Sequence, residues 1–416
     1  MKITPGVTWT SGATVNHTQL NNFLTNASIT SGALDQVALG ENALDSLTSG
    51  TDNVGIGDNA GTALTDGHSN VIIGNDALVT ADSAYNNVAI GENAMKLGSG
   101  SPAQNVAIGV NALIDLAGEV GSGQSYSNVA IGQDAAANVT TGTTNVMIGS
   151  SSGALLTTDS STNVLVGNGA MGSASAAVDA AVAVGAEALK VNTADLNVGV
   201  GYKAGVANTS GVDNTYVGSQ AGYTNITGTD NTFIGDNAGY YVTGSNSTAV
   251  GSAAFDDSGA AAYTNTTAIG FNASPSASNE VVLGDGNVTI IRSGSDDSCD
   301  LGSASNRFDD VYATNNTIQT SDKNLKKNIK KTNLGLAFLE KLRPVSYSWK
   351  TGKRKHYGFI AQEVEKALDG EDFGGLVKGV SGDGGYYGLR YNEFIGPLVK
   401  AVQELAARVA KLEGKA

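Results

Sequence analysis

The sequence predicts a mainly β protein, a parallel β-roll or β-solenoid that continues into a carboxy-terminal α/β domain ending in a coiled-coil helix. Two observations carry this prediction. A motif of the form Asn-Val-x-Ile-Gly-x-x-Ala recurs through the first two thirds of the chain, and the sign of the charge reverses at Ser321. Residues 1–320 contain 6 Lys and Arg against 28 Asp and Glu, whereas residues 321–416 contain 18 against 11.

The repeat is framed by glycines at a nearly constant interval. It reads NVGIGDNAG from Asn53 and NVAIGENAM from Asn87, and the late copy NTFIGDNAG from Asn231 keeps the frame. Most successive framing glycines are 16 to 18 residues apart. They are Gly40, Gly57, Gly74, Gly91, Gly109, Gly132, Gly149, Gly167, Gly185, Gly201, Gly218, Gly235, Gly251, Gly270 and Gly284.

One copy of the repeat predicts one coil. In Val-x-Ile the two β-branched residues lie two positions apart, so both side chains point to the same face of a short strand. The glycine allows a positive φ, and the alanine three residues later fits a crowded interior. Because one copy buries too little apolar surface to fold alone, we expect stacked copies to join their Val and Ile side chains into a continuous core.

The polar residues of the repeat have two interpretations. The asparagine that opens most copies is either a glycan or metal ligand, or one rung of a ladder that caps turns through side-chain-to-backbone bonds; its regularity favours the ladder. The acidic residues after several glycines (Glu41, Asp58, Glu92, Asp236) lack the spacing of a calcium loop and predict a solvated edge. Enlarged loops are expected at 117–127 and 256–265, which suit either recognition or a tolerated insertion.

Composition argues against several functional classes. The acidic repeats would repel the phosphates of a nucleic acid. The amino terminus lacks the apolar core of a signal peptide, and no segment is apolar enough for membrane insertion. The single cysteine, Cys299, excludes an intrachain disulfide, and the histidines have no partners at metal-ligand spacing. We therefore expect no cofactor and no metal. The histidines are His17, His68 and His356.

The repeats resemble the β-roll heads of trimeric autotransporter adhesins, which are built on similar VAIG…A motifs. The resemblance covers residues 34–290, although the copies here run a few residues longer than those of the adhesins. It implies a left-handed parallel β-roll with two strands in each coil. It also implies that three copies of the chain associate through one face of the rod.

Two short regions flank the repeats at residues 34–285. In residues 1–33, Leu20, Leu24 and Ala27 predict a short amphipathic helix. This module suits either a cap on the first solenoid edge or attachment to a virion, since it resembles the beginnings of phage tail-fibre proteins. Residues 286–320 alternate β-like runs with polar turns and predict a β stem.

The last 96 residues contain four landmarks. They are SDxxLKxNI from Ser321, LRPVSYSWK from Leu342, GFIAQEV from Gly358 and YNEF…AVQEL from Tyr391. Residues 321–416 thereby resemble the auto-cleaving intramolecular chaperone domain at the carboxy end of phage endosialidases and other tailspikes. The resemblance implies an α/β domain that directs trimer folding and cuts itself off with a Ser–Lys dyad. Carried onto this chain, Ser321 is the nucleophile, Lys326 is the base and Thr320–Ser321 is the scissile bond.

The dyad is chemically reasonable. A serine hydroxyl needs a base, and a lysine in an apolar setting, here expected from Leu325 and Ile329, loses enough pKa to serve as one. Because the fourth residue and not the fifth is the neighbour on a regular helix, we expect Ser321 in a bent segment before a helix. The alternative is that Ser321 only caps a helix starting at Asp322. The other nearby lysines, Lys327, Lys330 and Lys331, are expected to be solvated.

The final segment predicts a coiled-coil seam. Apolar residues alternate there at spacings of three and four, at Ile395, Leu398, Val402, Leu405, Val409 and Leu412. The alternative is one amphipathic helix that packs on its own domain. A parallel trimer fits better, because three chains must be brought into register before a long parallel rod can form.

These features together predict a trimeric phage tail fibre. We expect it to be made in the host cytoplasm, to join virion tail proteins through its amino terminus, and to bind a host-surface glycan or protein receptor. Loss of the chaperone after folding would leave a kinetically trapped trimer. The alternative is a tailspike enzyme that degrades surface polysaccharide. Such an enzyme needs paired carboxylates, and none stands out from the charges on the solvated edge.

Overall fold

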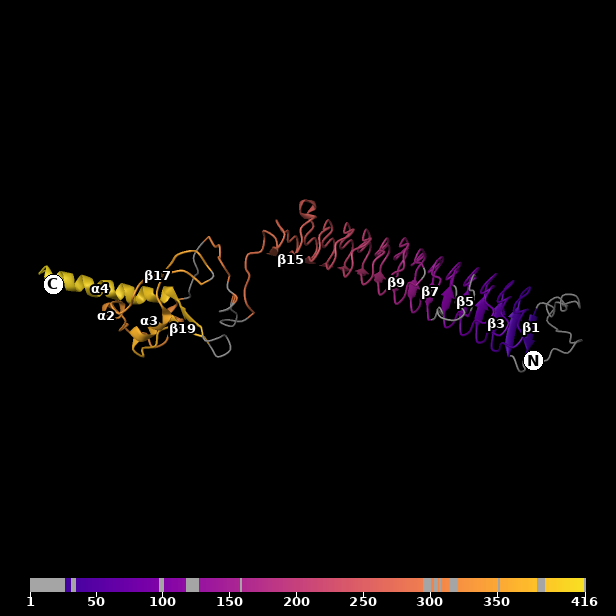
Figure 1. Cartoon of the computed structure of the whole chain (residues 1–416), viewed down its shortest axis with the longest axis horizontal. Helices are drawn as coiled ribbons and strands as arrows, with labels where there is room; N and C mark the ends of the chain where they lie inside the picture. Colours follow the sequence, from indigo (N-terminus) through magenta and orange to yellow (C-terminus); the bar gives the residue numbers. More distant parts are fainter. Residues whose placement is uncertain are drawn as a thin grey trace, which may run out of the picture. The chain divides into compact units, whose positions relative to one another are not determined.

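The computed structural model describes residues 27–30, 35–96, 101–116, 127–157, 159–294, 301–302, 306, 308–314, 321–350, 352–379 and 386–414. The chain forms two units, Met1–Ile290 and Ile291–Ala416. Figure 1 shows the first as a stack of coils and the second as a smaller unit with a long helix. Several residues singled out above lie outside the described ranges: Leu20, Leu24, Cys299, Thr320 and all of the 117–127 loop except Ser127.

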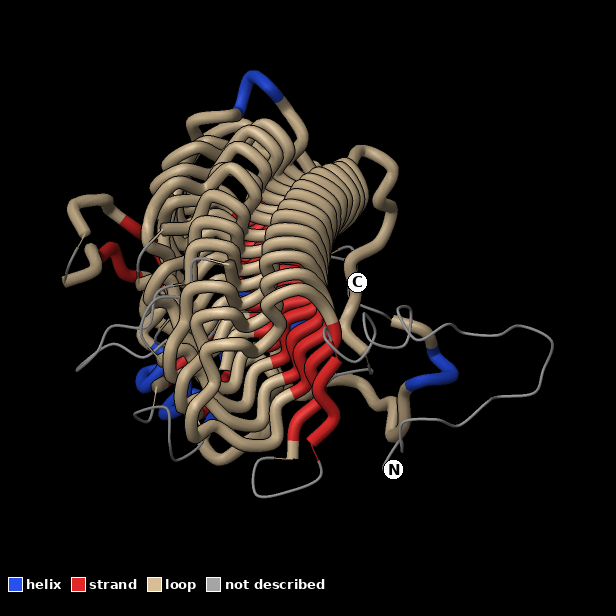
Figure 2. Tube along the Cα trace, turned by 90° about the vertical axis from the view of Figure 1, so that its right-hand side faces the viewer, coloured by secondary structure: helices blue, strands red, loops and turns tan. Residues whose placement is uncertain are grey.

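The first unit is a single sheet of 16 strands in sequence order. Strand β1 (Ala27–Thr30) is antiparallel to β2 (Gln36–Leu39), and β2 to β16 all pair in parallel with their neighbours. Figure 2 shows the strands stacked along one side of the coils. The remaining strands are β3 (Val54–Ile56), β4 (Val71–Ile73), β5 (Val88–Ile90), β6 (Val106–Ile108), β7 (Val129–Ile131), β8 (Val146–Ile148), β9 (Val164–Val166), β10 (Val182–Val184), β11 (Val198–Val200), β12 (Thr215–Val217), β13 (Thr232–Ile234), β14 (Thr248–Val250), β15 (Thr267–Ile269) and β16 (Val281–Leu283).

This architecture confirms the predicted parallel solenoid, with one coil for each copy of the repeat. The register never slips: Val88 lies beside Val106 and Ile90 beside Ile108, and the same positions pair in every later coil. The short helix predicted through Ala27 is wrong at that residue, because Ala27 lies in strand β1.

Each coil contains one strand and not the two expected of a β-roll. The rest of the coil turns through left-handed residues, such as Asn93 (φ 59°) and Met95 (φ 53°), which cannot belong to an extended strand. Backbone bonds between coils continue nevertheless, for example from Met95 N to Ala112 O at 3.0 Å. At the framing Gly91 (φ 137°) a Cβ atom would lie 2.4 Å from the Gly109 carbonyl oxygen, so glycine is required there.

The predicted core of the solenoid is wrong in one respect. The Val and Ile side chains of Val-x-Ile face outward and are half-buried or exposed, whereas the middle residue is buried. In β5, Ala89 is fully buried between the outward-facing Val88 and Ile90, and Ile131 in β7 likewise lies on the outer face. A two-residue period defines two faces, but it does not say which of them is inside.

Besides the middle residue of each strand, the interior contains alanines, large apolar residues and glycines from the turns. The alanine three positions after most framing glycines is buried, as predicted, and Ala94 is an example. Large turn residues also point into the interior. The Leu189 side chain occupies the space beside Gly199, where a Cβ added to that glycine would lie 2.8 Å from the leucine. Beside the aromatic strand residues the turn residue is glycine: a Cβ on Gly222 would lie 2.3 Å from the Tyr216 ring. In these coils a small turn residue therefore makes room for a large strand residue.

The asparagine ladder is confirmed, and it is buried. Asn145 Oδ1 accepts bonds from the backbone N and the Nδ2 of Asn163 at 3.0 and 3.1 Å. Asn145 Nδ2 in turn donates to Asn128 Oδ1 at 3.0 Å and to Ser160 O at 2.7 Å. Each rung thus satisfies backbone groups of the neighbouring coil. The acidic residues of the predicted edge, Glu41, Asp58, Glu92 and Asp236, are exposed.

The second unit packs short elements around an aromatic core. Phe338, Val364, Leu368 and Phe394 form its centre. Its elements are the 3-10 helix η2 (Lys323–Leu325), α2 (Leu336–Leu339), β17 (Val345–Tyr347) antiparallel to β18 (His356–Gly358), α3 (Ala361–Leu368), β19 (Leu376–Lys378) antiparallel to β20 (Tyr387–Leu389), the 3-10 helix η3 (Tyr391–Phe394) and α4 (Ile395–Leu412). The described residues between 286 and 314 contain no strand and no helix, although the sequence predicts a β stem there.

Candidate functional site

The two residues of the predicted dyad lie next to each other. The Nζ of Lys326 is 2.6 Å from the Oγ of Ser321, which is hydrogen-bonding distance. Ser321 precedes η2, and Lys326 is the residue that ends it, in extended conformation (φ −108°, ψ 141°). This bend brings a residue five positions along the chain back to the serine, as expected for a segment that is not a regular helix.

Asp322 explains why the chain bends there. Its side chain accepts a bond from Asn324 N at 2.8 Å, and Asp322 is therefore the N-cap of η2. The hydroxyl of Ser321 is directed instead to Lys326. The alternative interpretation of Ser321 as the cap of a helix that starts at Asp322 is therefore wrong.

The described residues of one chain do not form the apolar setting expected around Lys326. Leu325 is 75% exposed and Ile329 is 63% exposed, and the dyad itself lies on the surface. The neighbouring Lys327, Lys330 and Lys331 are exposed as well, as expected. Two apolar side chains beside the dyad thus lack any cover from the described part of their own chain.

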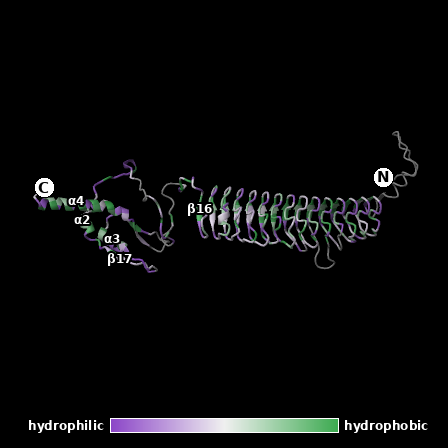
Figure 3. Cartoon of the chain, turned by 90° about the horizontal axis from the view of Figure 1, so that it is seen from above, coloured by the Kyte–Doolittle hydropathy of each residue, from purple (hydrophilic) through white to green (hydrophobic). Residues whose placement is uncertain are grey.

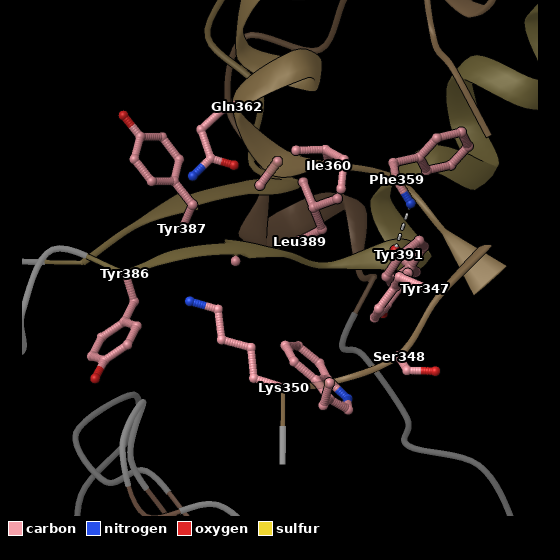
Figure 4. A pocket seen from close by; sticks show the side chains of 13 residues that line it. Tyr347, Ser348, Lys350, Phe359, Ile360, Gln362, Tyr386, Tyr387, Leu389 and Tyr391 are labelled. Carbon is pink, nitrogen blue, oxygen red and sulfur yellow. Dashed lines mark hydrogen bonds between the residues drawn. The ribbon is translucent and has the colours of Figure 1, made fainter. Parts of the chain in front are cut away.

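Three of the four sequence landmarks meet at one aromatic pocket, which the sequence did not predict. Its walls are Tyr347, Trp349 and Lys350 from the LRPVSYSWK segment and Phe359 and Gln362 from GFIAQEV, with β20 and Tyr391 on the remaining side (Figure 4). The backbone N of Phe359 donates to the Tyr391 hydroxyl at 3.1 Å and holds two of the segments together.

Helix α4 has one face on its own unit and one apolar face toward solvent. Ala401 is buried, and Glu404 Oε2 accepts a bond from Leu336 N at the start of α2 at 2.8 Å. The six predicted seam residues, by contrast, are 46% to 87% exposed. The seam therefore does not pack on its own unit. Figure 3 shows hydrophobic residues along the length of α4.

The first unit carries a second apolar surface. The outward Val and Ile side chains of successive strands lie in register, so they form a stripe that we call the strand face. Ile148, Val164, Ile234, Val250 and Ile269 are among its exposed members. Within the described residues, no group of three His, Cys, Asp or Glu side chains is placed to hold a metal ion. None of the helices in the described ranges is long and apolar enough to cross a membrane.

In a comparison with known families, residues 321–373 match the family described as chaperone of endosialidase. The second unit therefore contains an intramolecular chaperone domain of this kind, and the match begins at Ser321. Together with the parallel solenoid, it fits a protein of the phage fibre or tailspike type. A comparison with curated proteins finds no match to the chain.

Proposed function

We propose that the protein is a trimeric phage tail fibre that binds the host surface, and that its carboxy-terminal domain directs trimer folding and then cuts itself off before Ser321. The observation that carries the proposal is the 2.6 Å contact between Lys326 Nζ and Ser321 Oγ at the start of the segment that matches the chaperone family. Residues 1–33 would join the fibre to the virion tail.

Two exposed apolar surfaces support assembly from several copies. A protein alone in water rarely exposes a long continuous apolar stripe, yet this chain has two, the strand face and the seam of α4. The strand face keeps one register over all the parallel strands, so a second copy in the same orientation matches it along its full length. The seam has the spacing of a parallel coiled coil, which would set that orientation.

The proposed cleavage needs only the dyad and one water. Lys326 in its neutral form takes the proton from Ser321 Oγ, which attacks the carbonyl carbon of Thr320. The bond from this carbon to the Ser321 nitrogen breaks, and Lys326 returns the proton to that nitrogen. Water then hydrolyses the resulting ester, which leaves a carboxylate on Thr320 and a free amine and hydroxyl on Ser321.

We infer that this step follows assembly. A lysine serves as a base at neutral pH only if its surroundings favour the neutral form, and burial in an apolar environment does so. The exposed Leu325 and Ile329 are placed to form such an environment once another copy covers them. Cleavage would then report a correctly formed trimer, and loss of the chaperone would make the assembly difficult to reverse.

The test is expression of the whole chain without added protease. We expect two fragments of 320 and 96 residues, with Ser321 as the new amino terminus. Ser321→Ala and Lys326→Ala should each leave the chain intact, whereas the control Lys330→Ala should be cleaved like the wild type. Cleavage that persists in Ser321→Ala would show that another group attacks. Cleavage of a monomeric variant at the wild-type rate would refute the link to assembly.

A further inference from the structure

A cluster of tyrosines lies on the turns of neighbouring coils in the first unit. Tyr223 and Tyr240 both lie five residues after a framing glycine, so the stacking of coils places one above the other, and Tyr241 follows directly. We call these three residues the tyrosine surface. They belong to the turns after β12 and β13 and not to the strand face. Association of strand faces would therefore leave them accessible.

The three rings form a compact platform. The rings of Tyr223 and Tyr240 stack in parallel, with centroids 4.7 Å apart and an angle of 4° between planes. Tyr241 meets Tyr240 edge-on, also at 4.7 Å, and is 39% exposed. Large rings at a solvated surface combine an apolar face with a polar rim, which is characteristic of binding surfaces and unusual on an inert shaft.

Two side-chain oxygen atoms, one in the turn of Tyr240 and one in the turn of the next coil, have no hydrogen-bond donor in the described part of the chain. They are Oδ1 of Asp256 and Oδ1 of Asn237, and both are shielded from solvent. Burial, followed by the neighbouring Tyr223, Tyr241 and Asp256, raises the pKa of Tyr240, so the Asp256 carboxylate acts electrostatically on this ring. Buried acceptors without donors are costly, so a small shift of the turn that lets hydroxyl groups of a ligand reach them would be offset by the new hydrogen bonds.

An enlarged loop borders the same surface. Residues 256–265 begin with Asp256 and contain the 3-10 helix η1 (Ser258–Ala260), which projects from the stack (Figures 1 and 2). Irregular loops on a regular scaffold are frequent places of recognition. The tyrosine surface, the two unpaired oxygens and this loop lie within three consecutive coils.

We propose that the tyrosine surface, with Asp256 and Asn237 at its edge, binds an uncharged sugar unit of a surface glycan. A sugar ring has the size of the platform, its C–H face packs on aromatic rings, and its hydroxyls are donors for the two oxygens. This inference rests on the proposed host-binding function and assigns it a place and a ligand class.

Charge sets the kind of sugar. Burial, followed by the charges of Asp257 and Asp236, raises the pKa of the Asp256 carboxyl. Lys203, which acts on Tyr240 with the opposite sign, is paired with Glu187 at 3.7 Å. Acidic sugars would add to the repulsion among the carboxylates, so uncharged sugars are favoured. Three aromatic side chains bury at most roughly 250 Å² each, which together is less than the roughly 800 Å² that each partner contributes to a standard protein interface and argues against a protein ligand.

The experiment measures binding of the full-length trimer to a panel of uncharged oligosaccharides, made of glucose, galactose, mannose, rhamnose or N-acetylglucosamine, by saturation-transfer NMR and calorimetry. At least one should bind, and oligogalacturonate should bind at least 10-fold more weakly. Tyr240→Ala should reduce the affinity at least 10-fold, whereas Tyr240→Phe should retain most of it. Failure of the whole panel to bind would overturn the proposal.

A matched control is available on an earlier coil. Tyr85 stacks on His68 with centroids 5.4 Å apart, so Tyr85→Ala removes a comparable ring outside the surface and should leave binding unchanged. Host-cell adsorption separates the two proposals: adsorption that survives Tyr240→Ala refutes this site but not host binding. If Tyr240→Ala lowers the oligomer mass, the surface is instead a contact between copies and the glycan proposal fails.

Discussion

The buried and the surface asparagines of the coils differ in what their removal leaves behind. Asn145 connects two neighbouring coils through four hydrogen bonds, all within the interior. Asn168, at a turn, makes one exposed contact of 3.5 Å to Ser150 O. The same residue type therefore has a structural role at one position and a minor one at the other.

We predict that Asn145→Ala destabilises the first unit markedly. It leaves the buried backbone N of Asn163 and the carbonyl oxygen of Ser160 without partners, at a cost of about 1–3 kcal/mol for each unsatisfied group. The midpoint of thermal unfolding, followed by circular dichroism, should fall clearly. Asn168→Ala should shift it little, and equal shifts in the two variants would contradict a structural role for the ladder.

At the scale of the strand, buried and outward-facing side chains alternate. The buried ones serve the folding of the coil, and the outward-facing ones are available for association with another copy. Ala89 points inward and Ile90 points outward, although the two are adjacent in the chain. A charge at Ala89 would be buried without a partner, whereas a charge at Ile90 would meet solvent in a single chain and the neighbouring copy in a trimer.

We therefore predict different failures for two neighbouring substitutions. Ala89→Asp should prevent the coil from folding, at a cost of several kcal/mol, and should give insoluble protein. Ile90→Asp should preserve the circular dichroism spectrum but weaken the trimer, which light scattering would detect as a lower mass at low concentration. A stable trimer of Ile90→Asp would show that the strand face is not the interface.

In the second unit, a carboxylate on one helix caps another. Glu404 of α4 bonds the backbone N of Leu336, and the N-cap residue Gly335 provides no side-chain bond of its own. The Leu336 bond, followed by Lys400, lowers the pKa of Glu404 below its usual 4.5. This contribution to stability is therefore present above pH 4.5 and is lost as the pH falls through the lowered pKa of the folded state.

The corresponding prediction uses Ser321→Ala as background, so that the unit stays attached. Glu404→Gln should lower the unfolding midpoint of the second unit at pH 7, and the difference should shrink as the pH falls toward 3. The exposed Glu340→Gln is the control and should show no such pH dependence. A difference independent of pH would mean that the charge of Glu404 contributes nothing to the cap.

At the scale of the whole molecule, the repetitive and non-repetitive parts have different folding problems. The contacts between successive coils are local, but identical coils offer many wrong registers between chains, and parallel assembly of long β structures is slow and prone to aggregation. In the proposed trimer, the chaperone domain with its exposed seam on α4 would supply a single unambiguous register.

We predict that a chain of residues 1–320 alone is mostly insoluble or misassembled. The uncleaved Ser321→Ala chain, in contrast, should be soluble and trimeric, because the register depends on the domain and not on the cut. Sedimentation of both proteins after expression under the same conditions checks this. A soluble, trimeric 1–320 chain would show that the solenoid sets its own register.

Sequence alone was sufficient for the features that repeat. The period sets one coil for each copy, the framing glycines mark the positive φ angles, and the recurring asparagines predict the ladder, because stacking turns a linear period into contacts between equivalent positions. The landmarks of the last 96 residues identified the chaperone domain and paired Ser321 with Lys326.

Only the tertiary structure could decide between two arrangements that the same sequence pattern allows. Val-x-Ile fits an inward or an outward face equally well, and only the packing of side chains from several coils decides between them. In the folded coils these side chains face outward, and the middle residue, such as Ala89, packs inside with turn residues such as Leu189.

The fold also grouped Tyr223 and Tyr240, which lie 17 residues apart in the sequence. The tertiary structure also shows that Leu325 and Ile329 are exposed. The sequence could not reveal this, because the desolvation of Lys326 depends on residues outside its own segment.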